Sequence, residues 1–278
     1  MSVLVDKYVY PLTDFGFKKL FGTEPNKELL IDFLNQVLPA HHQIKELRYS
    51  PNEHLGPQAL DRKAIFDLYC TAGSGERFIV EIQKAKQNYF QDRCLYYASF
   101  PIQAQAQQGN WNFKLYSVYT IGILDFVFSD HKDEQAYYHL VELKDQECEV
   151  FSDKLKFIYI ELPKFTKTEA ELETTFEKWL YVFRHLAELQ NRPPKLQERI
   201  FQKLFQAAEI AKLSKNEREA YENSLKHYRD INNIADTSKE EGKLEGKMEV
   251  ARTMQEDGVP LEKIQQFTGL SMEELEKL

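Results

Sequence analysis

Residues 65–83 decide the fold, and they read IFDLYCTAGSGERFIVEIQ. Two β-prone runs flank the triplet Gly73-Ser74-Gly75, a pattern that predicts a hairpin turn. If Ser74 lies at the centre of the hairpin, Asp67 and Glu81 are equally far from it and face each other. The sequence therefore predicts two carboxylates side by side on neighbouring strands.

Alternation of side chains along the two strands predicts what each face of the hairpin carries. Asp67, Glu81 and Gln83 share one face, and the apolar face is expected to hold Phe66, Leu68, Cys70, Phe78, Val80 and Ile82. Like charges directly opposite each other destabilise a sheet, and a divalent cation is a natural compensating partner. The alternative is a solvated face on which the two carboxylates repel each other weakly.

The same stretch resembles the metal-dependent nuclease core written PD-(D/E)XK, in which an Asp ends one strand and a Glu-X-Lys occupies the next. Here Gln83 takes the place of the Lys, a form typical of the Rpn family of recombination-promoting nucleases, also labelled transposases. Further matches to the family occur in its order, at residues 13–22, 29–38 and 160–165 and at Arg93, Tyr96 and Tyr97. The resemblance covers roughly residues 10 to 190.

This resemblance implies an α/β fold, with a restriction-endonuclease-like core whose mixed central sheet is flanked by helices, and an α-helical C-terminal region. We expect the nuclease core over residues 1–165, a helical extension over 166–236, and a charged helix with a small helix-turn-helix-like tail over 237–278.

Periodicity and stop signals predict the elements of the core. Helices are expected over residues 14–21, 25–38 and 88–107, and strands over 44–49, 64–72, 76–84, 115–124, 137–150 and 155–162. The C-terminal region is expected to hold helices over 168–189, 196–213, 216–234, 239–256 and 261–267, and a last helix that begins after Ser271.

The resemblance also implies the roles of the hairpin residues. Asp67, Glu81 and the backbone carbonyl of Ile82 would hold Mg²⁺ or Mn²⁺, which prefers oxygen ligands. Such an ion lowers the pKa of a bound water and neutralises charge on the scissile phosphate. Gln83 can orient a water through its amide, but it brings no charge.

The missing ammonium has a cost, because a cation 4 Å from a charge contributes about 4 kcal/mol at an effective dielectric near 20. Either the enzyme is slow, or a second metal or a displaced lysine compensates. Lys86 and Lys63 are the candidate lysines and candidate substrate contacts. Lys84 is set aside, because strand alternation sends it to the opposite face.

Two further residues have two readings each. Asp14 matches a family position where an acidic residue lies near the metal, but after Thr13 it equally suits a helix N-terminus. Arg93 is expected to meet substrate phosphate as a bidentate donor, or else to form a surface ion pair, for example with Asp92.

Composition and charge limit the kinds of partner that the protein can bind. The 278-residue chain is 42% hydrophobic, with no apolar run that could span a bilayer and no visible secretory signal, so we expect a cytoplasmic protein without membrane contact. Its three cysteines and seven histidines form no ligand pattern, and His41 and His42 are expected in solvent. A net charge of −8 does not attract a polyanion, so contact with DNA should be transient, weak and salt-sensitive.

The last 20 or so residues resemble a minimal helix-turn-helix. The would-be recognition helix carries Glu273, Glu274 and Glu276 against Lys277, whereas phosphate contacts favour Lys and Arg. We therefore favour a protein contact, with self-association through an incompletely buried apolar set: Leu261, Ile264, Phe267, Leu270, Met272 and Leu275.

The leading hypothesis is a metal-dependent DNA endonuclease of low sequence specificity that promotes recombination, with Asp67, Glu81, Gln83 and Asp14 as its catalytic residues. The rival is a weakly catalytic or non-catalytic protein that keeps the nuclease fold and regulates a partner through its C-terminal helices. The acidic net charge and the Gln favour the rival, whereas the carboxylate pair favours the enzyme. RNA remains an alternative substrate.

Overall fold

The computed structural model describes residues 6–39, 42–51, 53–54 and 64–278. Its helices are α1 (Asp14–Phe21), α2 (Lys27–Val37), α3 (Phe90–Gln103), α4 (Thr175–His185), α5 (Arg199–Ala208), α6 (Lys215–Glu256), α7 (Leu261–Thr268) and α8 (Met272–Leu275). Its strands are β1 (Leu47–Tyr49), β2 (Glu53–His54), β3 (Ala64–Ile65), β4 (Leu68–Ala72), β5 (Arg77–Gln83), β6 (Val118–Leu124), β7 (Tyr138–Lys144) and β8 (Val150–Glu161). The chain divides into two compact units, residues 1–228 and 229–278, and α6 contributes to both.

The first unit is built on a mixed six-stranded sheet in the order β1-β4-β5-β6-β8-β7. Strand β6 pairs in parallel with β5 on one side and with β8 on the other. The pairs β1 with β4, β4 with β5, and β7 with β8 are antiparallel. Helix α3 lies in the crossover between β5 and β6, as parallel neighbours require. This architecture confirms the expected α/β class with a mixed central sheet.

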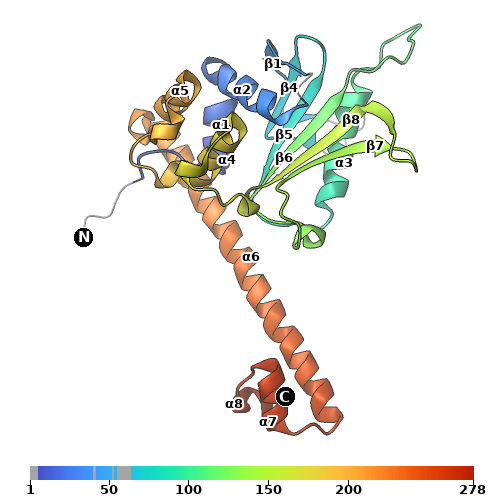
Figure 1. Cartoon of the computed structure of the whole chain (residues 1–278), viewed down its shortest axis with the longest axis vertical. Helices are drawn as coiled ribbons and strands as arrows, with labels where there is room; N and C mark the ends of the chain where they lie inside the picture. The colour runs from blue at the N-terminus through green and yellow to red at the C-terminus, as the bar shows by residue number, and fades with distance from the viewer. Residues whose placement is uncertain (1–5, 40–41, 52, 55–63) are drawn as a thin grey trace. The chain divides into compact units, whose positions relative to one another are not determined.

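Helices cover both faces of this sheet (Figure 1). Helices α1, α2, α4 and α5 lie on one face, where the largest apolar core includes Trp179, Phe33 and Val80. Helix α3 lies on the other face, over a smaller core that includes Cys94 and Tyr159. The edge where β5 and β6 end is thus flanked by helices from both layers.

The hairpin of β4 and β5 has the expected register. Leu68 pairs with Val80 and Thr71 with Arg77, so Ser74 is its centre. The turn requires a glycine at position 75, where φ is +105° and an added Cβ would lie 2.5 Å from the ring of Tyr116.

One side chain of the hairpin differs from expectation. Phe66 does not share a face with Leu68; it packs with Tyr69 and Ile79, against Tyr97 and Phe100 of α3. The backbone bends at Asp67, between β3 and β4, and strict alternation does not hold across a bend.

Other expectations also needed correction. Pro25 lies in a short 3-10 helix, Glu24–Asn26, and α2 begins only at Lys27. The helices expected over 216–234 and 239–256 are one continuous helix, α6, because the segment between them holds no proline and the two glycines of the later segment weaken a helix without ending it. His42 is not simply solvated, since its Nε2 lies 2.8 Å from the hydroxyl of Tyr119; His41 lies outside the described residues.

The second unit has its own small core. Ala251, Ile264, Leu270 and Leu275 are buried where α7 and α8 pack on the end of α6, and a capping box between Ser271 and Glu274 starts α8. The unit buries its apolar set only partly, as expected: Ile264, Leu270 and Leu275 are buried, Leu261 and Met272 are half-buried, and Phe267 is 72% exposed. No helix in the described ranges combines the length and apolarity needed to cross a bilayer.

Candidate functional site

Asp67 lies just before the start of β4, and Glu81 lies near the end of β5, so the two residues are neighbours at the same end of these strands. The Asp67 N–H donates to Glu81 Oε1 over 3.2 Å, and the Ile82 N–H donates to Asp67 Oδ2 over 2.8 Å. Glu81 is only 7% exposed. The structure thus brings the two carboxylates together, as the hairpin register predicts.

Both carboxylates resist ionisation. Burial raises the pKa of Asp67 to about 6, against the effect of the hydrogen bond from Ile82. Burial, and next the charge of Asp67, raises the pKa of Glu81 well above its usual range. Two buried carboxylates that lie together offer the oxygen ligands that a divalent cation prefers.

Ile82 meets this pair through its backbone N–H, while its side chain belongs to the main apolar core. The role expected for its carbonyl stays a prediction.

Gln83 is engaged on both sides of its amide. Arg93 Nη2 donates to Gln83 Oε1 over 2.5 Å, and Gln83 Nε2 donates to the carbonyl of Ala85 over 2.8 Å. Arg93 Nη1 donates to Gln87 Oε1, also over 2.5 Å. The ion pair of Arg93 with Asp92, one of its two expected readings, is not found within the described part of the chain.

Asp14 fits the reading as a helix N-terminal residue. It is the first residue of α1, after the N-cap Thr13, and its carboxylate lies 2.7 Å from Lys18 Nζ. After burial and the hydrogen bond from Ile82, the negative charge of Asp14 is a further influence on Asp67 and also raises its pKa. The other reading, a place near the metal, stays a prediction.

Lys84 is linked electrostatically to the acids of the site. Burial lowers its pKa, and the negative charges of Asp14 and Asp67 act in the opposite direction. Its Nζ lies 5.8 Å from the ring centroid of Tyr228. Tyr228 and Ile82 both belong to the main apolar core, so Lys84 packs on the face that strand alternation predicts, opposite to Gln83.

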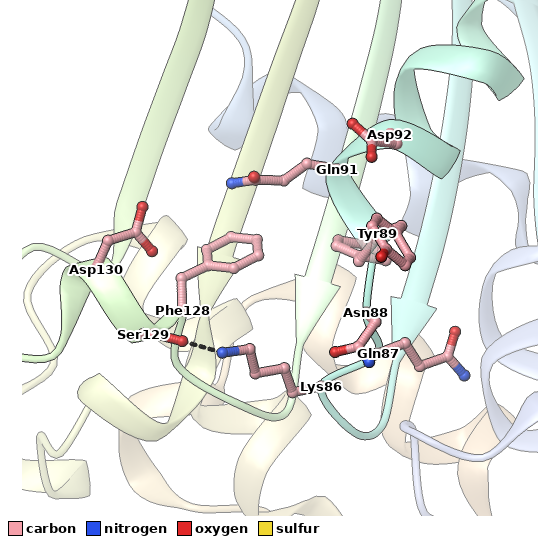
Figure 2. Close-up of a pocket in the computed structure, with 10 residues that line it drawn as sticks. Lys86, Gln87, Asn88, Tyr89, Gln91, Asp92, Phe128, Ser129 and Asp130 are labelled. Atoms are coloured by element: carbon pink, nitrogen blue, oxygen red, sulfur yellow. Dashed lines mark hydrogen bonds between the residues drawn. The ribbon is translucent and has the colours of Figure 1, made fainter.

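The sequence favoured two other lysines as the displaced cation. Lys86 Nζ bonds to Ser129 Oγ (Figure 2). Lys63 lies outside the described residues.

A second polar cluster gathers around Glu161, which no histidine spacing predicted. Its carboxylate is buried and accepts from the Phe128 N–H over 2.7 Å, with His131 and His139 at 3.3 and 3.2 Å. The ligand atoms of the three side chains lie within 4.8 Å of one another, as a metal site would need.

Lys164 already neutralises Glu161, with Nζ 2.7 Å from Oε2. Although burial opposes it, the hydrogen bonds from Lys164 and the Phe128 N–H hold the pKa of Glu161 below its usual range. A cation would have to share the carboxylate with this ammonium, so we assign the cluster to fixing the segment from Phe128 to His131. The sequence does mark this place, because residues 160–165 match the family, but the match gave Glu161 and Lys164 no role.

A cavity of about 310 Å³ lies between this segment and the start of α3 (Figure 2). Its lining residues are Lys86, Gln87, Asn88, Tyr89, Phe90, Gln91, Asp92, Phe128, Ser129 and Asp130. Gln87 connects the cavity to the carboxylate pair, since Arg93 binds both Gln87 and Gln83.

A mixed sheet with flanking helices, and an Asp and a Glu on adjacent strands, is the arrangement of a nuclease-like α/β core. Residues 11–238 match the family described as PD-(D/E)XK nuclease family transposase, and the chain belongs to this family. Residues 244–278 match the C-terminal HTH domain of the Rpn/YhgA-like nuclease family. No curated protein and no solved structure matches the chain.

Proposed function

We propose that this protein is a divalent-metal-dependent DNA endonuclease of low sequence specificity that promotes recombination. The observation that carries the proposal is the buried carboxylate pair, Asp67 and Glu81, interlocked on adjacent strands of a nuclease-family core. Buried acids with raised pKa values are common at functional sites, because a fold seldom keeps them without use.

In this proposal, Asp67 and Glu81 hold Mg²⁺ or Mn²⁺, with the Ile82 carbonyl as a further ligand. When bound, the ion activates a water and neutralises charge on the phosphate. Asp67 and Glu81 are preorganised for this, since each is fixed by a backbone N–H of the hairpin.

Lys84 supplies the positive charge that Gln83 lacks. It follows Gln83 directly, its ammonium is partly buried, and the negative charges of Asp14 and Asp67 act on it. Gln83 then positions Arg93, whose guanidinium is held between Gln83 and Gln87 and would meet a phosphate of the substrate. In this assignment the motif lysine is displaced by one residue.

DNA contact is expected to be weak and salt-sensitive, because the net charge is −8. The C-terminal HTH match offers a second DNA contact, but its last helix carries Glu273, Glu274 and Glu276. We therefore keep self-association as the proposed role of that unit.

The rival, a weakly catalytic or non-catalytic binding protein, has one observation in its favour. Both ends of the Gln83 amide are occupied, by Arg93 and by the Ala85 carbonyl, so the amide has less capacity to orient a water.

Plasmid nicking decides between the two. Wild-type protein is incubated with supercoiled DNA in Mg²⁺, in Mn²⁺ and in EDTA, beside Asp67→Asn. Asp32→Asn is the matched control, because Asp32 is another carboxylate whose pKa burial raises, and it binds Trp179 far along the chain. Nicking that needs the metal and Asp67 but not Asp32 supports the enzyme; absence of nicking in every condition supports the rival.

A further inference from the structure

We propose that the cavity beside α3 receives an unpaired nucleobase, so that the preferred substrate is single-stranded or locally unpaired nucleic acid. This inference rests on the proposed function, and it names the substrate class of the same site. The volume of the cavity, about 310 Å³, lies at the lower end of the range for small-molecule pockets, which is roughly 300–1,000 Å³.

Tyr89 is the first observation. It precedes α3 with φ of +60°, in the left-handed region, and its side chain makes no capping hydrogen bond. Glycine or asparagine normally takes such a position, and a bulky residue there is uncommon. The ring is also 80% exposed, so core packing does not explain it. An exposed aromatic ring held in an uncommon backbone conformation fits base stacking, which tolerates any base.

The polar lining is the second observation. Asn88, Gln91, Asp92 and Asp130 offer amides and carboxylates, which pair with the donors and acceptors of base edges. Among the described residues that line the cavity, Lys86 is the one cation, and it is bonded to Ser129. Two carboxylates against one engaged lysine disfavour a phosphate and allow an uncharged base.

Position is the third observation. Gln87 lines the cavity and accepts from Arg93, whose other nitrogen donates to Gln83, two residues after Glu81. A base seated at Tyr89 therefore belongs to a nucleotide close to the phosphate that would meet the carboxylate pair.

The opposite wall is preformed. The buried carboxylate of Glu161 holds the Phe128 N–H at 2.7 Å, and His131 lies 3.3 Å from the same oxygen. Phe128, Ser129 and Asp130 are thereby fixed before any ligand arrives.

The test measures binding, in Ca²⁺, of a fluorescein-labelled single strand and of the duplex with the same sequence. Tyr89→Ala is compared with Tyr89→Phe and with Phe113→Ala. Phe113 is a matched control, since it is 77% exposed and also has positive φ, of 58°. We expect Tyr89→Ala to weaken single-strand binding about tenfold, in line with the loss of one stacked base, and to change duplex binding less than twofold. Tyr89→Phe and Phe113→Ala should bind as the wild type does.

Tyr89→Gly separates stacking from a structural role. It relieves the left-handed backbone, so the variant should be at least as stable as the wild type while it loses single-strand binding. Equal losses in Tyr89→Ala and Phe113→Ala, or equal losses for single strand and duplex, would overturn the proposal. If Tyr89-dependent binding persists in a protein that never nicks DNA, the nuclease proposal fails and the base pocket stands.

Discussion

A backbone hydrogen bond joins Asp67 to Glu81: the Asp67 N–H donates to Glu81 Oε1 over 3.2 Å. This bond holds the second carboxylate against the first, although burial raises both pKa values and the charge of Asp67 raises that of Glu81 further. The arrangement costs stability without a cation and favours binding when one is present.

Glu81→Gln is expected to abolish metal-dependent cleavage, because it removes one charged ligand. Without metal, the same change should leave stability unaltered or raise it by about 0.5–1 kcal/mol, since facing like charges are relieved. Urea unfolding in EDTA and in Mg²⁺ checks this, with Mg²⁺ stabilising the wild type only. Full activity in Glu81→Gln would show that the site is misassigned.

The pair also predicts a pH dependence. The pKa of Asp67 is raised from about 3.9 in an unfolded chain to about 6 in the fold. The folded state therefore binds more protons between these values, and the contribution of Asp67 to stability is full below about pH 4 and lost as pH rises through about 6. Mg²⁺ should raise the Tm clearly at pH 8 and little at pH 5, where protons compete for the carboxylates. An equal Mg²⁺ effect at both pH values, or the same pH dependence in Asp67→Asn, would contradict this.

Lys84→Met should lower the cleavage rate by about 100-fold, in the range seen when one preorganised stabilising group is removed. Lys86→Met is the comparison, because Lys86 is the other candidate for the displaced lysine; it bonds to Ser129 in the cavity wall, so its loss should affect substrate binding more than the rate at saturation. Single-turnover rates at saturating Mg²⁺ check the comparison. A larger loss from Lys86→Met would reverse the assignment of the displaced lysine.

From the sequence alone, Gln83→Lys is expected to support or raise cleavage by restoring the motif cation. The structure changes that expectation, because a lysine there would lose the bond to Arg93 and face its guanidinium. We expect Gln83→Lys to be less active and less stable by about 1 kcal/mol, the usual contribution of one hydrogen bond. The double variant with Arg93→Gln should recover stability; if the single variant is already more active, Arg93 does not constrain this position.

Phe267→Ser tests self-association through the second unit. Ile264, Leu270 and Leu275 are buried within that unit, whereas Phe267 is 72% exposed and available to a second copy. Light scattering on the full chain should show a smaller assembly for the variant, with single-turnover cleavage unchanged. An unchanged assembly with weakened DNA binding would favour DNA contact by the helix-turn-helix instead.

The sequence predicted the parts of this protein that depend on local rules. The Gly73-Ser74-Gly75 turn and two-residue alternation were enough to set Asp67 against Glu81. Helix α1 and the strand β5 also began and ended within a residue of expectation, because caps and periodicity are encoded locally.

The features that the sequence did not predict depend on local backbone geometry or on contacts between residues far apart in the chain. Phe66 lies just outside a regular strand, where a bend removes the alternation rule. His139 meets Glu161 because the pairing of β7 with β8 sets it opposite Tyr159, two residues before Glu161, and His131 reaches the same carboxylate from a separate 3-10 turn. Such contacts between residues 22 and 30 positions apart leave no periodic signal.

Gly75 has no side chain, yet the position of the two carboxylates depends on it. The turn it forms sets the hairpin register, and a slip of one residue would exchange the two faces of a strand. The carboxylates would then point into the main apolar core, and residues of that core toward the face covered by α3. Loss-of-function variants of this protein should therefore include positions that touch neither metal nor nucleic acid, and an inactive variant at Gly75 would report misalignment of the strands with every acid intact.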